Sequence, residues 1–215
     1  MAHPDASTLR EVLDLAQEFD CLDFKQEWTD LKGEARAGLA KDVLSFANSG
    51  GGLIVVGVND DGARVGLSAA IDPSIVRQAV AAFLPTGESP ATLYNFEVDG
   101  LRYQILLIDS DDELLPYESA RSGAGIERGR VYVRSGTINS EASSSQMIDL
   151  VRRRDLARTL PAPSLDEMLD GLESCFRRLG IEDHGAAWRA EYDAYLRSLI
   201  AKAERNIERR LTGRN

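Results

Sequence analysis

Asp23 and Lys25 are an acidic residue and a lysine separated by one position, in a stretch where polar and apolar residues alternate. On a strand this spacing places both side chains on one face of the sheet. Carboxylates can hold Mg²⁺ or Mn²⁺, the metal can polarise a phosphate and activate a water, and a lysine can stabilise the developing charge. Glu18, near the end of a predicted helix, and Asp60, after a predicted buried strand, could converge on the same point. These four residues are therefore candidates for metal-dependent phosphodiester cleavage, with Glu18, Asp23 and Asp60 as metal ligands.

Each of these residues also has an ordinary structural interpretation. An Asp-x-Lys pair occurs by chance in many proteins, and a glutamate on a helix usually lies on a solvated face. Asp60 and Asp61 precede Gly62, which is the composition of a turn. Residue types and spacing alone leave both interpretations open.

Cysteine and histidine are scarce in this chain, with two of each among 215 residues. This scarcity excludes a disulfide scaffold and a cysteine-rich zinc site, and it argues against a Ser-His-Asp triad. A bound metal would need carboxylate ligands, which favours Mg²⁺ or Mn²⁺. The N-terminus lacks the pattern of a signal peptide, and no apolar run approaches membrane-spanning length. We therefore expect a reduced, cytoplasmic protein without a membrane segment.

The formal net charge is −10 and the isoelectric point is near 4.8. This charge excludes a broad electrostatic binder of nucleic acid but leaves room for a local basic groove. Basic residues that flank the candidate site, or that lie on one face of a later strand, are the candidates for nucleic-acid contacts. They are Lys32, Arg36, Lys41, Arg130 and Arg134.

A glycine-rich bend, Asn48 to Gly52, lies between a predicted helix and a predicted strand. Such a bend can cradle a phosphate with backbone N–H groups. Phosphate-binding loops of nucleotide folds, however, run from strand to helix. We therefore favour a tight turn that lets the helix pack on the strand.

Hydrophobic periodicity predicts the elements that must position these residues. Thr8 and Glu11 have the spacing of a capping box at the start of a first helix. Further helices are expected at 33–48, 73–84 and 144–158, and strands at 21–28, 53–58, 93–98, 101–108 and 130–134. A linker at 160–163 precedes a predicted helical hairpin at 164–211. We expect two domains, 1–158 and 159–215.

Four blocks of this sequence resemble the Schlafen/AlbA_2 domain. They are Glu18-x4-Asp23-Phe24-Lys25, the stretch from Leu44 to Gly62 with its Phe-Ala-Asn-Ser-Gly-Gly-Gly and Gly-Val-Asn-Asp-Asp-Gly motifs, Val65-Gly66-Leu67, and Val131 to Thr137. Their order and spacing extend the resemblance over about residues 18–150. The resemblance implies an α+β fold, with a mixed β-sheet flanked by helices.

In Schlafen-type nucleases the resemblance also implies a three-carboxylate site that uses Mg²⁺ or Mn²⁺ to cut RNA, notably tRNA, and sometimes single-stranded DNA. Carried over by motif, the acids are Glu18, Asp23 and Asp60, with Asp61 as the alternative third acid. Asp23 departs from the family's usual glutamate and would shift a metal by about one methylene.

Three functions follow as hypotheses. The first is a Schlafen-type nuclease, toxin-like or acting in antiphage defence. The second is a non-catalytic nucleic-acid-binding or transcription-regulatory module. The third is an assembly subunit, in which the hairpin at 164–211 forms a homodimer or docks a partner protein instead of folding back on the main domain. Schlafen nucleases bring two such lobes together and this chain has one, so the resemblance favours a homodimer.

Overall fold

The computed structural model describes residues 10, 12–14, 18–28 and 31–159. All of them belong to one unit, Asp5–Thr159. The predicted capping box at Thr8, the linker and the helical hairpin at 164–211 lie outside the described residues. The division of the chain at residue 158 stays a prediction.

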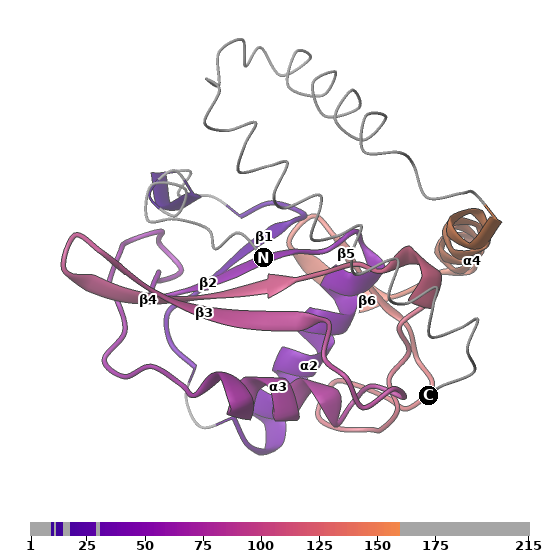
Figure 1. Ribbon diagram of the computed structural model, residues 1–215, viewed down its shortest axis with the longest axis horizontal. Helices are drawn as coiled ribbons and strands as arrows, with labels where there is room; N and C mark the ends of the chain where they lie inside the picture. Colours follow the sequence, from indigo (N-terminus) through magenta and orange to yellow (C-terminus); the bar gives the residue numbers. More distant parts are fainter. Residues whose placement is uncertain (1–9, 11, 15–17, 29–30, 160–215) are drawn as a thin grey trace, which may run out of the picture. The chain divides into compact units, whose positions relative to one another are not determined.

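A four-stranded mixed sheet with the strand order β1-β2-β4-β3 is the centre of the described fold (Figure 1). Strand β1 (Leu22–Lys25) pairs in parallel with β2 (Gly52–Val56), and β2 pairs antiparallel with β4 (Leu101–Ile108). Strand β3 (Ala91–Val98) forms the other edge, antiparallel to β4. The α+β fold with a mixed sheet is confirmed.

The two faces of the sheet have different apolar clusters. Leu22 and Phe24 of β1 pack with residues of β2 and β4 on one face. The other face is covered by helices α2 (Gly33–Asn48) and α3 (Pro73–Ala81), which lie on one side of the sheet in Figure 1. Because successive side chains of a strand alternate, Asp23 and Lys25 point toward this helical side. Helix α2 therefore decides what the two polar side chains of β1 meet.

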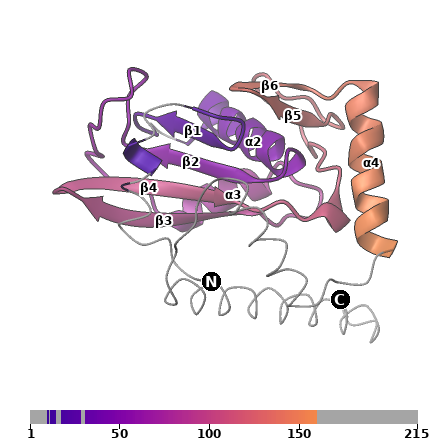
Figure 2. The same cartoon turned by 90° about the horizontal axis from the view of Figure 1, so that it is seen from above.

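A separate two-stranded hairpin of β5 (Tyr132–Ser135) and β6 (Ile138–Glu141) packs on α2. Helix α4 (Ser144–Thr159) follows it and lies beside the hairpin, as Figure 2 shows from above. It contacts the short 3₁₀ helix η1 (Asp112–Leu114). The sequence did not predict β6, since its four residues show no apolar alternation and most of them are exposed. Within the described residues, no helix combines the length and the apolar character that a membrane crossing requires.

The glycine-rich bend after α2 is a packing turn, as favoured from the sequence. Gly51 has φ +86°, and a Cβ built there would lie 2.6 Å from the Ile108 carbonyl oxygen. A Cβ at Gly52 would lie 2.5 Å from the Cys21 carbonyl oxygen. Glycine is needed because β1 and β4 approach the turn closely from either side. The turn brings α2 directly into β2 and so fixes the helix over the polar face of β1.

Candidate functional site

The Asp23 carboxylate lies between two cations. Lys25 Nζ is 2.7 Å from Asp23 Oδ2, and Arg134 Nη2 is 2.9 Å from Asp23 Oδ1. The Asp23 side chain is 5% exposed and that of Arg134 is 1% exposed. Both carboxylate oxygens are thus paired with a cation inside the fold, which offsets part of the cost of burying the charge. Among the described residues, the buried atoms Asp23 Oδ2 and Arg134 Nε have no hydrogen-bond partner.

Arg134 joins three elements around this carboxylate. It extends from β5, and its guanidinium lies over the Phe46 ring of α2, 4.4 Å from the ring centre. Asn139 of β6 donates from Nδ2 to Asp42 Oδ1 of α2 at 2.6 Å. We call Asp23, Lys25, Asp42, Arg134 and Asn139 the Asp23 cluster. The cluster connects β1, α2 and the β5–β6 hairpin.

Asp42 carries the largest electrostatic perturbation in the cluster. Burial raises the pKa of this half-buried carboxyl to about 6, and the neighbouring charge of Asp23 acts in the same direction. Lys25, Arg134 and the hydrogen bond from Asn139 oppose that rise. A carboxyl with this pKa gains or loses its proton just below neutral pH, which is the range in which a general acid or base of an enzyme titrates.

Lys25 is the member of the cluster that reaches solvent, with 40% of its side chain exposed. Burial acts to lower the pKa of the ammonium, but the charges of Asp42, Asp23 and Glu18 outweigh it, and the pKa is raised. The lysine therefore stays charged at neutral pH and keeps a local positive centre beside three acids.

Glu18 and Asp60, the other two predicted metal ligands, are placed differently. Glu18 Oε1 accepts a hydrogen bond from the Phe24 backbone N–H at 3.2 Å, next to β1. Asp60 is exposed in the turn after β2, where Asn59 Oδ1 accepts from the Asp61 N–H at 3.1 Å. Asp60 and Asp61 thus occupy the turn that their composition indicates.

This donor set does not fit a metal ion as it stands. Across residues 10, 12–14, 18–28 and 31–159, no three His, Cys, Asp or Glu side chains are grouped to hold one. Asp23 would have to exchange two cationic partners for the metal, and Asp60 lies in an exposed turn. Metal binding by Glu18, Asp23 and Asp60 stays a prediction.

Two of the predicted nucleic-acid contacts, Arg130 and Arg134, already have acidic partners. Arg134 is buried against Asp23. Arg130 pairs with Glu141 at 2.8 Å and with Glu127 at 3.5 Å. A phosphate would compete with these partners at either position.

The other three predicted contacts, Lys32, Arg36 and Lys41, lie along α2. Lys41 lies over the Tyr132 ring, 4.9 Å from its centre. Lys32 is the N-cap of α2, and Arg36 donates to two backbone carbonyls of α3. Within the described part of the chain, the Arg36 guanidinium is thus held by backbone carbonyls and has no carboxylate or aromatic partner.

Sequence reasoning missed Asp42 and Asn139. Asp42 lies one helical turn before the buried Phe46 of α2, so a signal was available: an acidic residue at helical spacing from an apolar one. Asn139 gave no such signal, because its strand was not predicted and its role depends on the fold bringing β6 to α2.

Residues 18–143 of the chain match the family model of the Schlafen, AlbA_2 domain. The match covers more than half of the sequence, and the chain belongs to the Schlafen AlbA_2 family. The family associates the chain with nucleic acid. No curated protein matches the sequence.

Twelve chains of solved structures match this chain. The DIP2311 protein of Corynebacterium diphtheriae aligns with a TM-score of 0.49 and 20% identity, over 69% of this chain and 32% of that protein. The N-terminal domain of a RecG-related protein of Nitrosomonas europaea aligns with a TM-score of 0.41 and 22% identity, over 65% of this chain and 94% of that domain. The aligned part of this chain spans about a third of DIP2311.

Proposed function

We propose that this chain is a nucleic-acid-binding module of the AlbA_2 family, in which the Asp23 cluster holds the fold together and does not hold a metal. The observation that carries the proposal is the engagement of both Asp23 oxygens, by Lys25 at 2.7 Å and by Arg134 at 2.9 Å. Family membership supports the choice of nucleic acid as ligand.

The energetics of the Asp23 cluster support a structural role. A metal ion at Asp23 would displace at least one cation that is desolvated together with the carboxylate. Leaving a buried charge without its partner costs several kcal/mol. The Arg134 side chain is 1% exposed and cannot regain water without a rearrangement of β5.

The ligand we expect is RNA or single-stranded DNA, bound in a regulatory or assembly context. The test is fluorescence anisotropy with labelled 20-nucleotide RNA and DNA in a series of NaCl concentrations. We expect binding that weakens steeply with salt, because a local basic surface on an acidic protein acts through phosphate neutralisation. The RNA and DNA should stay intact in Mn²⁺. Absence of binding at low salt would overturn the proposal.

A second candidate is a Mg²⁺- or Mn²⁺-dependent nuclease. The specific observation in its favour is Lys25, which is partly exposed and surrounded by the charges of Asp42, Asp23 and Glu18. In this role Glu18, Asp23 and Asp60 would supply the carboxylates, and Lys25 would orient the phosphate. The Asp23 carboxylate would first have to be released from Arg134.

A cleavage assay on tRNA and single-stranded DNA, with Mn²⁺ and with EDTA, separates the two candidates. The informative variant is Asp60→Asn, and Glu97→Gln on the exposed side of β3 is its matched control. A nuclease should lose activity at least tenfold in Asp60→Asn and keep it in Glu97→Gln. Cleavage that is equal in all three proteins would point to a contaminant and remove the site assignment.

A homodimer or partner contact through residues 164–211, and a role in antiphage defence, are further proposals that rest on the sequence. Light scattering on the full-length protein measures the first directly. A mass of one chain at micromolar concentration would remove the homodimer.

A further inference from the structure

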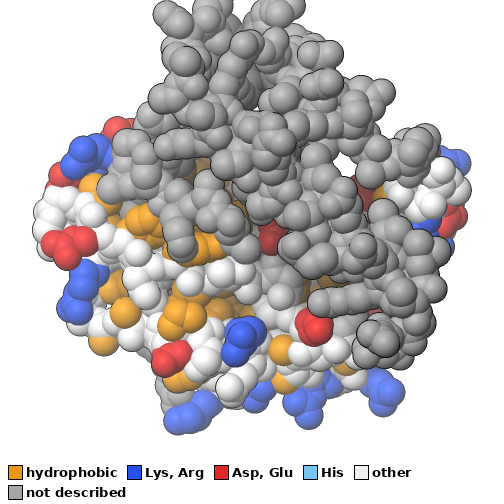
Figure 3. Space-filling view, viewed as in Figure 1, with side chains coloured by type: hydrophobic (Ala, Val, Ile, Leu, Met, Phe, Trp, Pro, Cys, Tyr) orange, Lys and Arg blue, Asp and Glu red, His pale blue; other side chains and the backbone are white. Residues whose placement is uncertain are grey.

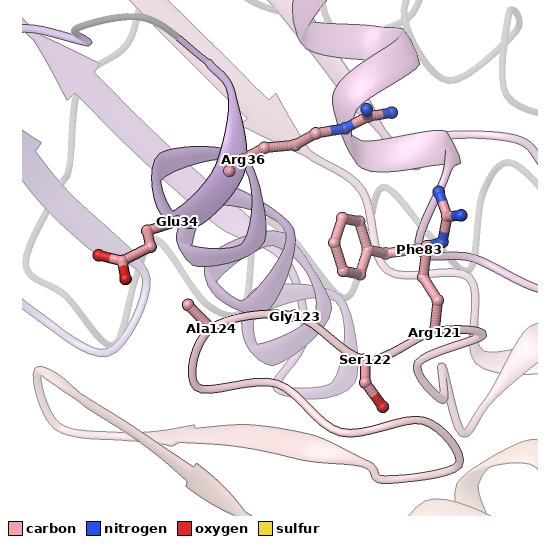
Figure 4. Close-up of a pocket in the computed structure, with 8 residues that line it drawn as sticks. Glu34, Arg36, Phe83, Arg121, Ser122, Gly123 and Ala124 are labelled. Carbon is pink, nitrogen blue, oxygen red and sulfur yellow. The ribbon is translucent and has the colours of Figure 1, made fainter.

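We infer that a cavity at the N-terminal end of α2 binds a phosphate group of the nucleic-acid backbone through Arg36 and Arg121. The cavity has a volume of about 460 Å³ and lies between the first turns of α2, Phe83 and the loop at 121–124 (Figure 4). This inference rests on the proposed function and places the ligand on a surface outside the Asp23 cluster.

Arg121 is the first reason for this assignment. Its guanidinium is exposed, and its one contact within the described part of the chain is the Phe83 ring, 6.0 Å from the ring centre. An aromatic ring orients a guanidinium but leaves its N–H groups available. Arg121 can therefore offer two parallel donors to a phosphate.

Arg36 is the second reason. Its Nε donates to the Ala79 carbonyl at 3.4 Å and its Nη2 donates to the Gln78 carbonyl at 3.2 Å. These bonds hold the side chain along the end of α3, and Nη1 has no hydrogen bond among the described residues. Figure 4 shows the Arg36 side chain extending from α2 toward α3 and the Arg121 side chain rising from the loop beside Phe83, and all three residues line the cavity. Two oriented guanidinium groups thus border one opening.

The loop that carries Arg121 is held in place before any ligand binds. The Ala120 N–H donates to the Phe83 carbonyl at 2.7 Å, and the Gly123 N–H donates to the Ile126 carbonyl at 2.9 Å. A Cβ at Gly123 would lie 2.9 Å from the Ala37 Cβ, so the loop backbone lies directly on α2. A loop in this position needs little further ordering to bind, which favours affinity.

The local charge balance favours an anion. Glu34 also lines the cavity, but its carboxylate points away from both arginines in Figure 4. Neither Arg77 nor Arg128 has an acidic partner in the described part of the chain, and the backbone N–H of Arg128 donates to Oγ of the cavity residue Ser122. Figure 3 shows Lys and Arg side chains gathered along the edge where α3 lies. By contrast, Arg130 pairs with Glu127 and Glu141, and Arg153 pairs with Asp112.

The geometry predicts contact with phosphate and no reading of bases. Guanidinium groups on phosphates position a nucleic acid and carry no sequence information by themselves. The Phe83 side chain is 5% exposed and is therefore too buried to serve as a stacking platform for a base.

The experiment uses full-length protein and compares Arg121→Gln with the control Arg152→Gln. Arg152 on α4 is 76% exposed and its nearest acid, Asp149, is 3.7 Å away, so both changes remove one surface charge. In anisotropy titrations with a labelled 20-nucleotide single strand, Arg121→Gln should weaken binding about three- to tenfold. Its log–log salt slope should fall by about one. Arg152→Gln should stay within about twofold of the unchanged protein.

Equal affinities for the unchanged protein, Arg121→Gln and Arg152→Gln would overturn the cavity assignment and leave nucleic-acid binding intact. If the unchanged protein binds no nucleic acid, the proposed function fails and the cavity is tested by itself with pyrophosphate. Saturable shifts of the Arg36 and Arg121 Nε–H resonances in an NMR titration would support a phosphate site. Absence of such shifts would overturn it.

Discussion

Arg134 Nη2 lies 2.9 Å from Asp23 Oδ1, and the two residues are 111 positions apart in the chain. The contact joins the β5–β6 hairpin to the first strand of the central sheet. It therefore connects the first and the last of the four Schlafen-like blocks, each of which supplies one residue of a buried ion pair. Substituting one residue of this pair therefore tests directly how much the contact between the hairpin and the sheet contributes to stability.

Replacing Arg134 by glutamine should destabilise the protein by about 3 kcal/mol, because Asp23 would keep a buried charge with only Lys25 as partner. Urea unfolding followed by circular dichroism measures the change. The matched control is Arg130→Gln, an exposed pair whose loss should cost at most about 1 kcal/mol. Equal losses in the two variants would show that the buried pair contributes no more than a surface pair.

The pH dependence of stability should contain a contribution from Asp42. Its pKa is about 6 in the folded protein and near 3.8 as a free group, so the folded state binds this proton more tightly. The stability contributed by protonated Asp42 is therefore lost as the pH rises from about 4 to about 6, and the loss is complete above that range.

Asp42→Asn keeps the side chain neutral at every pH and should remove this loss. Relative to the unchanged protein it should gain stability between pH 4.5 and pH 7.5, by on the order of 2 kcal/mol. Urea unfolding at the two pH values measures the difference. Asp60→Asn, an exposed residue of a turn, is the control and should show no comparable trend. A relative loss of stability at pH 7.5 in Asp42→Asn would contradict the sign.

Asn48 should be among the least replaceable residues of the Phe-Ala-Asn-Ser-Gly-Gly-Gly motif. It is 1% exposed, and its Nδ2 donates to the Tyr117 carbonyl at 2.9 Å and to the Tyr132 carbonyl at 2.8 Å. Its Oδ1 accepts from the Tyr117 N–H at 2.8 Å. One amide thus satisfies three backbone groups on two other segments.

Asn48→Ala should lower the free energy of unfolding by about 3 kcal/mol, since buried backbone groups lose their partners. Ser45→Ala in the same helix is a matched control, because the Ser45 hydroxyl donates to the Lys41 carbonyl one turn earlier and does not bridge to another segment among the described residues. Chemical denaturation of both variants provides the measurement. A loss no larger than that of Ser45→Ala would show that water replaces the amide.

The local features of this fold could be predicted from the sequence, and the partners across the fold could not. Alternation around Asp23 and Lys25 correctly placed both on one face of β1, and helix 33–48 has the predicted bounds. Even spacing of Arg130 and Arg134 predicted that both lie on one face of a strand at 130–134, but β5 begins at Tyr132 and leaves Arg130 outside it. Their difference in burial depends on α2 covering Arg134 and leaving Arg130 exposed, which only the tertiary packing decides.

In the candidate site too, the sequence predicted the residues of one local segment but not their partners from distant segments. Glu18, Asp23, Lys25 and Asp60 were predicted from spacing and from a family resemblance, and three of them lie at or beside β1. The cavity with Arg36 and Arg121 brings together residues 85 positions apart, with no shared motif or periodicity. A surface of this kind emerges only when α2, α3 and the loop at 121–124 are placed together.

The last prediction separates packing from backbone strain at the turn after α2. Gly50 and Gly51 both have positive φ, at +102° and +86°. A Cβ at Gly50 would meet nothing within 4 Å, whereas one at Gly51 would lie 2.6 Å from the Ile108 carbonyl oxygen. Gly50→Ala should therefore cost only the backbone term, about 1–2 kcal/mol. Gly51→Ala should cost about 2 kcal/mol more, because β4 would have to move away from the turn. Thermal unfolding of both variants measures the difference. Equal melting temperatures would show that the close approach of β4 adds no cost, and that the positive φ alone accounts for glycine in this turn.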